Sequence, residues 1–78
     1  MKTFKVLGSG CKKCETTADM IKRKSDELGI EITIEKVTDM GAIMGYGVMS
    51  TPGVVVDEKL VHAGSVPGAR QVAEWLEN

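Results

Sequence analysis

The feature that constrains the fold most is an unbroken run of valines, Val54-Val55-Val56, directly after Thr51-Pro52-Gly53. A β-branched run without polar alternation is typical of a strand buried on both faces, which places it in the interior of its sheet. Asp57-Glu58-Lys59 predicts a tight reversal into a second strand over residues 60–63. The second half of the chain therefore contributes a hairpin to a sheet.

The first half of the chain alternates strand, helix and strand. Lys2–Leu7 reads as a strand, which Gly8-Ser9-Gly10 ends. A helix is then expected to begin at Cys11 or Lys12 and to end at Gly29. Its small and apolar positions recur every three or four residues, which is one helical face: Cys14, Ala18, Ile21, Ser25 and Leu28. The alternation of Ile30, Ile32 and Ile34 with polar residues predicts a half-exposed second strand.

Two further helices complete the pattern. Thr38 or Asp39 is a suitable cap for a short helix over residues 40–44, ended by Gly45 and Gly47. A last helix is predicted from Pro67 to Leu76, with Ser65 as its cap. The order strand, helix, strand, helix, strand, strand, helix predicts one α/β domain over residues 1–78.

Charge and hydropathy limit the partners and the compartment. The chain of 78 residues has 10 Lys and Arg against 11 Asp and Glu, a net charge of −1, so we expect no nucleic-acid partner. No apolar run approaches the roughly 20 residues that span a bilayer, and the apolar stretch at the start is too short for a signal peptide. We therefore expect a cytoplasmic protein without a membrane partner.

The two cysteines, Cys11 and Cys14, stand close together at the expected start of the first helix. A bridge between them closes too short a loop to restrain much of the unfolded chain, so redox or metal chemistry explains the pair better. Free backbone N–H groups and the helix dipole favour a thiolate at that position. Lys12 and Lys13 add positive charge near the sulfurs, or are merely solvated; both interpretations stay open.

Three alternatives to redox chemistry can explain the cysteine pair: a structural role in the core, copper binding and zinc binding. The cysteines can be inert core residues, or they can bind a metal, as in a copper-carrier domain with a CxxC between a first strand and a helix. That fold ends on a strand, whereas this sequence predicts a terminal helix. Zinc needs four ligands, and His62 is the only histidine and is expected to point outward from its strand.

Three motifs give the sequence a resemblance to a known family. They are Gly10-Cys11-Lys12-Lys13-Cys14, Tyr46 to Pro52, and Gly64-Ser65-Val66-Pro67 followed by Val72, Trp75 and Leu76. Together they resemble the thioredoxin-like small redox-active disulfide proteins, which have a minimal thioredoxin fold of glutaredoxin-like size. The resemblance implies a four-stranded mixed sheet of order 2-1-3-4, flanked by three helices.

The resemblance also implies a function. Cys11 matches the attacking cysteine and Cys14 the resolving one of a thiol–disulfide oxidoreductase whose only redox group is the Cys11–Cys14 disulfide, without metal or other cofactor. Pro52 matches a cis proline that faces the disulfide, and Thr51 a residue whose backbone binds an extended substrate segment. We also assign Lys12 and Lys13 to the substrate-binding surface. The expected partners are protein disulfides and an unidentified disulfide reductase as electron donor, with the protein acting as a monomer.

The sequence departs from better-known relatives at several positions. Thioredoxin usually has Trp before its first cysteine and Gly-Pro between the pair, where this chain has Gly10 and Lys12-Lys13. The first strand carries Lys5 and no carboxylate, which leaves water or Glu15 as the proton acceptor for Cys14. The acidic pair with which glutaredoxins bind glutathione is absent.

Two other functional hypotheses remain open: a CxxC metal (copper) carrier and a redox-controlled interaction module. Three methionines, Met40, Met44 and Met49, are expected in the core or at the rim of a partner-binding surface.

Overall fold

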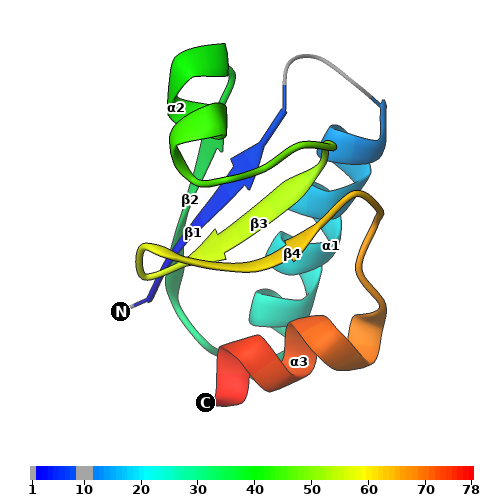
Figure 1. Ribbon diagram of the computed structural model, residues 1–78. Helices are drawn as coiled ribbons and strands as arrows, with labels where there is room; N and C mark the ends of the chain where they lie inside the picture. The colour runs from blue at the N-terminus through cyan, green and yellow to red at the C-terminus, as the bar shows by residue number, and fades with distance from the viewer. Residues whose placement is uncertain (1, 9–11) are drawn as a thin grey trace.

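A computed structural model describes residues 2–8 and 12–78 of the chain. Figure 1 shows four strands and three helices in the predicted order. Their bounds are β1 Lys2–Leu7, α1 Lys12–Leu28, β2 Ile32–Val37, α2 Met40–Gly45, β3 Gly53–Val56, β4 Lys59–Ala63 and α3 Ala69–Glu77.

The four strands form one mixed sheet of order β2-β1-β3-β4, as the resemblance implies. β1 pairs parallel to β2 and antiparallel to β3, and β3 pairs antiparallel to β4. The valine run lies in β3, an interior strand, where Val54 and Val55 are both fully buried. The pattern that predicted a strand covered on both faces is therefore confirmed.

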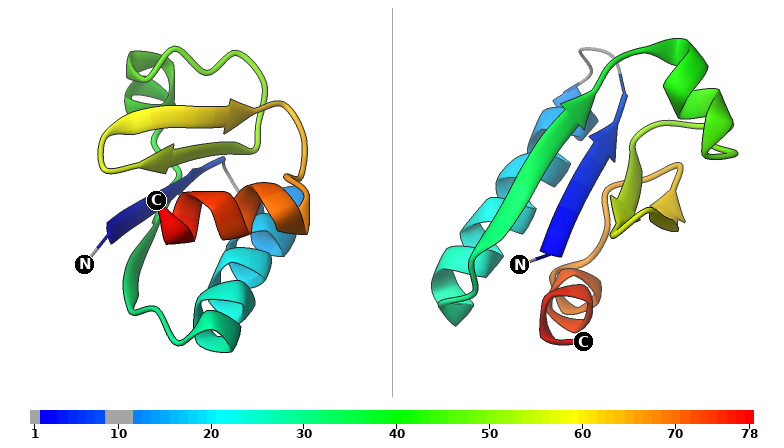
Figure 2. Two further views of the ribbon diagram at one scale, coloured as in Figure 1. Left: turned by 90° about the horizontal axis from the view of Figure 1, so that it is seen from below. Right: turned by 90° about the vertical axis from the view of Figure 1, so that its left-hand side faces the viewer.

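Helices cover both faces of this sheet, and the right-hand view of Figure 2 shows α1 and α2 on opposite sides of the strands. On one face, Phe4, Val6 and Val54 pack with buried residues of α1 and α3: Cys14, Ala18, Ile21, Val72 and Leu76. On the other face, a smaller cluster joins Leu7 and Val55 to Ile43 of α2 and to Val48. Successive residues of a strand point to opposite faces, which is why β1 and β3 each contribute buried residues to both clusters.

The ends of the first two helices follow the sequence signals. Gly29 adopts φ +68°, and the N–H of Ile30 donates to the Ser25 carbonyl, which closes the C-terminus of α1. The Asp39 side chain accepts from the N–H of Ala42 and so caps α2. Both predicted ends are confirmed.

The predicted start of the last helix at Pro67, with Ser65 as cap, is wrong. α3 begins at Ala69 after Gly68, whose N–H donates to the Gln71 side chain at 3.0 Å. Ser65 Oγ lies 3.0 Å from His62 Nε2, so its hydroxyl is engaged in the β4–α3 connection and not at the helix.

Across residues 2–8 and 12–78, no helix combines the length and the apolar character that a membrane crossing requires.

Candidate active site

Cys14 lies in the first turn of α1, with its side chain on the core-facing side of the helix. Only 6% of the residue is exposed, and it packs in the same cluster as Ala18 and Ile21. The structure has Cys14 disulfide-bonded. Cys11, the predicted attacking cysteine, lies outside the described residues, as do Ser9 and Gly10. Cys14 is therefore the sulfur around which the site is described.

Gly8, at the end of β1, allows two parts of the site to come together. A Cβ atom at this position would lie 2.2 Å from Cys14 Sγ and 3.3 Å from Thr51 Cβ. The sulfur and Thr51 thus both lie close to Gly8, on the side of its backbone where there is room for a hydrogen only. The N–H of Gly8 donates to the Val37 carbonyl of β2 at 2.9 Å, which fixes it in place.

The sequence analysis assigned Gly8 only to a strand-ending turn and missed its place in the site. The signal was its position between the first strand and the CxxC motif, three residues before Cys11. A glycine there is also the residue that permits the closest backbone approach.

The segment before β3 brings Thr51 and Pro52 to the same place. The Thr51–Pro52 peptide bond is cis, the form that the resemblance implies. Thr51 is exposed, whereas Pro52 is buried. The N–H of Gly64 donates to the Pro52 carbonyl at 2.9 Å, so the β4–α3 connection holds this segment in place. The exposed side of Thr51 is left facing solvent beside Cys14.

The two lysines of the motif lie at the solvent-facing start of α1. Lys12 and Lys13 are both exposed. Lys12 and Glu15 line a groove between α1 and β2 that also includes Asp19 and Lys36. The groove mixes both signs of charge, so it provides no concentrated anion site. Because Lys12 and Lys13 are solvent-exposed, their charges stabilise a nearby thiolate only weakly.

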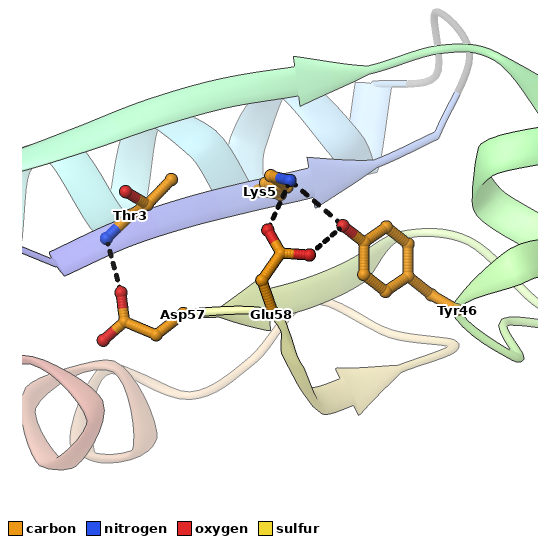
Figure 3. A network of polar contacts seen from close by, with 5 residues as sticks. All are labelled: Thr3, Lys5, Tyr46, Asp57 and Glu58. Carbon is orange, nitrogen blue, oxygen red and sulfur yellow. Dashed lines mark hydrogen bonds and ion pairs between the residues drawn. The ribbon is translucent and has the colours of Figure 1, made fainter.

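Lys5, the charged residue of the first strand, lies on the face of the sheet opposite Cys14. Phe4 and Val6 pack with Cys14, so Lys5 and Leu7 point to the α2 side. Lys5 Nζ there donates to Glu58 at 2.6 Å and to the Tyr46 hydroxyl at 3.0 Å (Figure 3). These hydrogen bonds, from Glu58 first and Tyr46 second, raise the pKa of Lys5 above its ordinary value.

The exposed methionines are not core residues. Met40 and Met44, one turn apart on α2, are 60% and 69% exposed, and Met49 is 97% exposed. The buried side of α2 is occupied by Ile43 instead. The core interpretation of these residues is wrong. Met49 stands two residues before Thr51, beside the described site.

Comparisons with known proteins agree with this geometry. Residues 2–77 match the thioredoxin domain family. A thioredoxin of Methanocaldococcus jannaschii is 37% identical over 78 residues, covering 100% of this chain and 90% of that protein. A thioredoxin of Methanothermobacter thermautotrophicus is 29% identical over 76 residues, covering 97% of this chain and 99% of the relative.

Solved structures show the same fold at low sequence identity. A mutant thioredoxin from Halobacterium salinarum superposes with a TM-score of 0.73 at 13% identity, over 97% of this chain and 72% of that one. Thioredoxin-2 of a malaria parasite, described as a component of the parasite's protein secretion machinery, also reaches 0.73, at 11% identity over 99% of this chain and 82% of its own.

Proposed function

Since the chain belongs to the thioredoxin domain family and is a thiol–disulfide oxidoreductase like its named relatives, we propose that it reduces disulfide bonds of partner proteins through Cys11 and Cys14. The observation that carries the proposal is the close approach of Cys14 Sγ and Thr51 around Gly8. It sets a cysteine sulfur beside an exposed backbone segment that is able to receive an extended substrate.

The reaction runs in two exchange steps. The Cys11 thiolate attacks one sulfur of the partner disulfide, so a mixed disulfide forms and the other partner sulfur leaves as a thiolate. The Cys14 thiolate then attacks the Cys11 sulfur, which releases the second partner thiolate. Two electrons have passed to the partner, and Cys11 and Cys14 are left as a disulfide. A disulfide reductase returns two electrons to complete the cycle.

The burial of Cys14 supports its proposed role as the resolving cysteine. With only 6% exposed, it is poorly accessible to a bulky disulfide in solution but well placed to attack a sulfur at the start of its own helix. Lys12 and Lys13 lie at the rim of the site, where they contribute to the substrate-binding surface. Thr51 offers its backbone to the substrate segment, and buried Pro52 supports it.

The wider setting is proposed on the same basis. Residues 1–78 act as one domain and as a monomer, in the cytoplasm, with the cysteine pair as the only redox group and without metal. The nearly balanced charge supports partners that are neither nucleic acids nor membranes.

Trapping the mixed disulfide tests this proposal. Reduced Cys14→Ser protein is mixed with a disulfide-containing protein such as insulin, and adducts are detected on non-reducing gels. We expect a covalent adduct that dithiothreitol cleaves, because the variant cannot resolve the mixed disulfide. The matched control, Cys11→Ser, has lost the attacking sulfur and is expected to form almost none. Equal adducts from both variants would contradict the assigned roles.

Turnover by the unchanged protein separates the remaining alternatives. Insulin reduction by dithiothreitol should be accelerated by the protein equally with and without a chelator. Loss of all activity on chelation would favour the metal carrier. Adduct formation without any turnover would favour a redox-controlled interaction module.

A further inference from the structure

A polar network joins three distant parts of the chain on the α2 side of the sheet (Figure 3). Lys5 Nζ of β1 donates to Glu58 Oε1 at 2.6 Å and to the Tyr46 hydroxyl at 3.0 Å. The Tyr46 hydroxyl in turn donates to Glu58 Oε2 at 2.8 Å. Each of the three side chains contacts the other two, so the network is closed on itself.

Glu58 joins this polar network from a backbone conformation with positive φ. Asp57 and Glu58 form the β3–β4 turn with φ angles of +47° and +70°, a region that favours glycine. The Asp57 side chain and N–H both bond to the backbone of Thr3, at 2.9 Å each, so Asp57 holds the turn to β1. Glu58 instead directs its side chain toward Tyr46. A two-residue hairpin turn favours positive φ at both of its central residues, so the turn itself places Glu58 where its side chain meets Lys5 and Tyr46.

Tyr46 connects this network to the site. It is the residue at the C-terminal cap of α2, and its ring packs against the cluster of Leu7, Ile43, Val48 and Val55. The segment that follows, residues 47–51, is called the docking loop here because it ends at Thr51. Within it Val48 is buried, whereas Met49, Ser50 and Thr51 are exposed.

Both ends of the docking loop are therefore held by hydrogen bonds. After the loop, the Pro52 carbonyl accepts from Gly64. Before the loop, the Tyr46 hydroxyl is held by Lys5 and Glu58. At its start, Gly47 N–H donates to the Met44 carbonyl at 2.9 Å and Val48 N–H to the Ile43 carbonyl at 3.4 Å. These backbone hydrogen bonds tie the loop to α2, and the hydroxyl network ties the C-terminal end of α2 to β1 and to the β3–β4 turn.

We propose that Tyr46 is a positioning residue for substrate binding: Lys5 and Glu58 fix its hydroxyl, and it fixes the docking loop that presents Thr51 to a protein disulfide. This inference rests on the proposed function. The network lies on the face of the sheet opposite Cys14, so it acts on how protein substrates dock and not on the thiol chemistry.

The size of the effect follows from the population of the docked loop. If the loop occupies its binding position for only a fraction of the time, the apparent affinity falls by that fraction. Tyr46→Phe keeps the ring and removes the hydroxyl. Losing this anchor is expected to raise KM for a protein disulfide by about three- to tenfold, the range that one hydrogen bond supports. A small aromatic disulfide, which has no segment to lay along the loop, is expected to react at an unchanged rate.

The β3–β4 turn supplies a matched pair of variants. Glu58→Gly and Asp57→Gly both place glycine at a positive φ, but only the first removes a partner of Tyr46. Steady-state kinetics of all three variants are measured with insulin and with 5,5′-dithiobis(2-nitrobenzoate). We expect Tyr46→Phe and Glu58→Gly to raise KM for insulin alone, with kcat retained, and Asp57→Gly to leave KM unchanged.

Three results would overturn the inference: an unchanged KM for insulin in Tyr46→Phe, an equal loss with the small disulfide, or an equal rise in Asp57→Gly. The last two are what a general loss of stability would produce. Failure of the proposed function is distinguishable, because the unchanged protein would then reduce no insulin at all.

Discussion

Replacing Gly8 by alanine is expected to destabilise the oxidised protein more than the reduced one. A Cβ at this position would lie 2.2 Å from Cys14 Sγ, far inside van der Waals contact, so the sulfur or the backbone must move. In the oxidised protein the sulfur is held by its disulfide bond. In the reduced protein the Cys14 side chain is free to change rotamer and to relieve the contact.

The magnitude follows from the cost of overpacking a filled site, which is about 1–3 kcal/mol. The strain of alanine at φ +157° is common to both redox forms, so the free energy of unfolding should fall in both, and by about 1–3 kcal/mol more in oxidised than in reduced Gly8→Ala. Because the oxidised form is penalised selectively, the reduced form is favoured. At about 30 mV per 1.4 kcal/mol, the reduction potential of the cysteine pair should become less negative by about 20–60 mV.

Denaturant unfolding of both redox forms, and equilibration with a glutathione buffer, measure these two quantities. Gly45→Ala is the matched control, because nothing lies within 4 Å of a Cβ there. Gly45 is the last residue of α2, so an alanine there should stabilise the protein by less than about 1 kcal/mol and leave the potential unchanged. Equal destabilisation of the oxidised and reduced Gly8→Ala protein, with no shift in potential, would refute the contact with the sulfur as the cause.

Three further predictions concern the described contacts. Hydrogen bonds from Lys5 and then Tyr46 lower the pKa of Glu58 below its usual 4.5. The wild type should therefore be more stable than Glu58→Gln at pH 7, and this difference in the free energy of unfolding should shrink as the pH falls below 4.5. A difference in urea unfolding that does not depend on pH would contradict this. Asp39→Ala removes the cap of α2 and should cost about 0.5–2 kcal/mol in the same assay, whereas no loss would show that α2 is held by packing alone. Met49, at 97% exposure, should be converted to sulfoxide by dilute peroxide before the partly buried Met20, and peptide mapping that finds Met20 oxidised first would contradict this.

Local patterns were sufficient for most of the fold. The valine run predicted β3 as an interior strand because β-branched residues without alternation need apolar neighbours on both faces. Gly29 and Asp39 predicted the end of α1 and the start of α2 because each satisfies unpaired backbone groups with its own atoms. The start of α3 was wrong because Ser65 is engaged by His62, a contact that local propensity does not include.

The parts that were missed depend on contacts between distant elements. Gly8 belongs to the site only because β1, α1 and the segment before β3 meet there. Lys5 lies 41 residues from Tyr46 and 53 from Glu58 in the sequence, so their network becomes visible only once β1 is paired with β3. The cysteine spacing and the Thr-Pro pair indicate the chemistry from the sequence. The residues that position the site become visible only through tertiary contacts.

The central claim is that Cys11 attacks and Cys14 resolves, and competitive alkylation of the reduced protein tests it most directly. Iodoacetamide below one equivalent is added at pH 7, and the protein is digested with trypsin. Cleavage after Lys12 and Lys13 puts the two cysteines on separate peptides, residues 6–12 and 14–22, that mass spectrometry quantifies independently. Faster labelling of the Cys11 peptide is expected, because Cys14 is only 6% exposed. Faster or equal labelling of the Cys14 peptide would contradict the assigned roles.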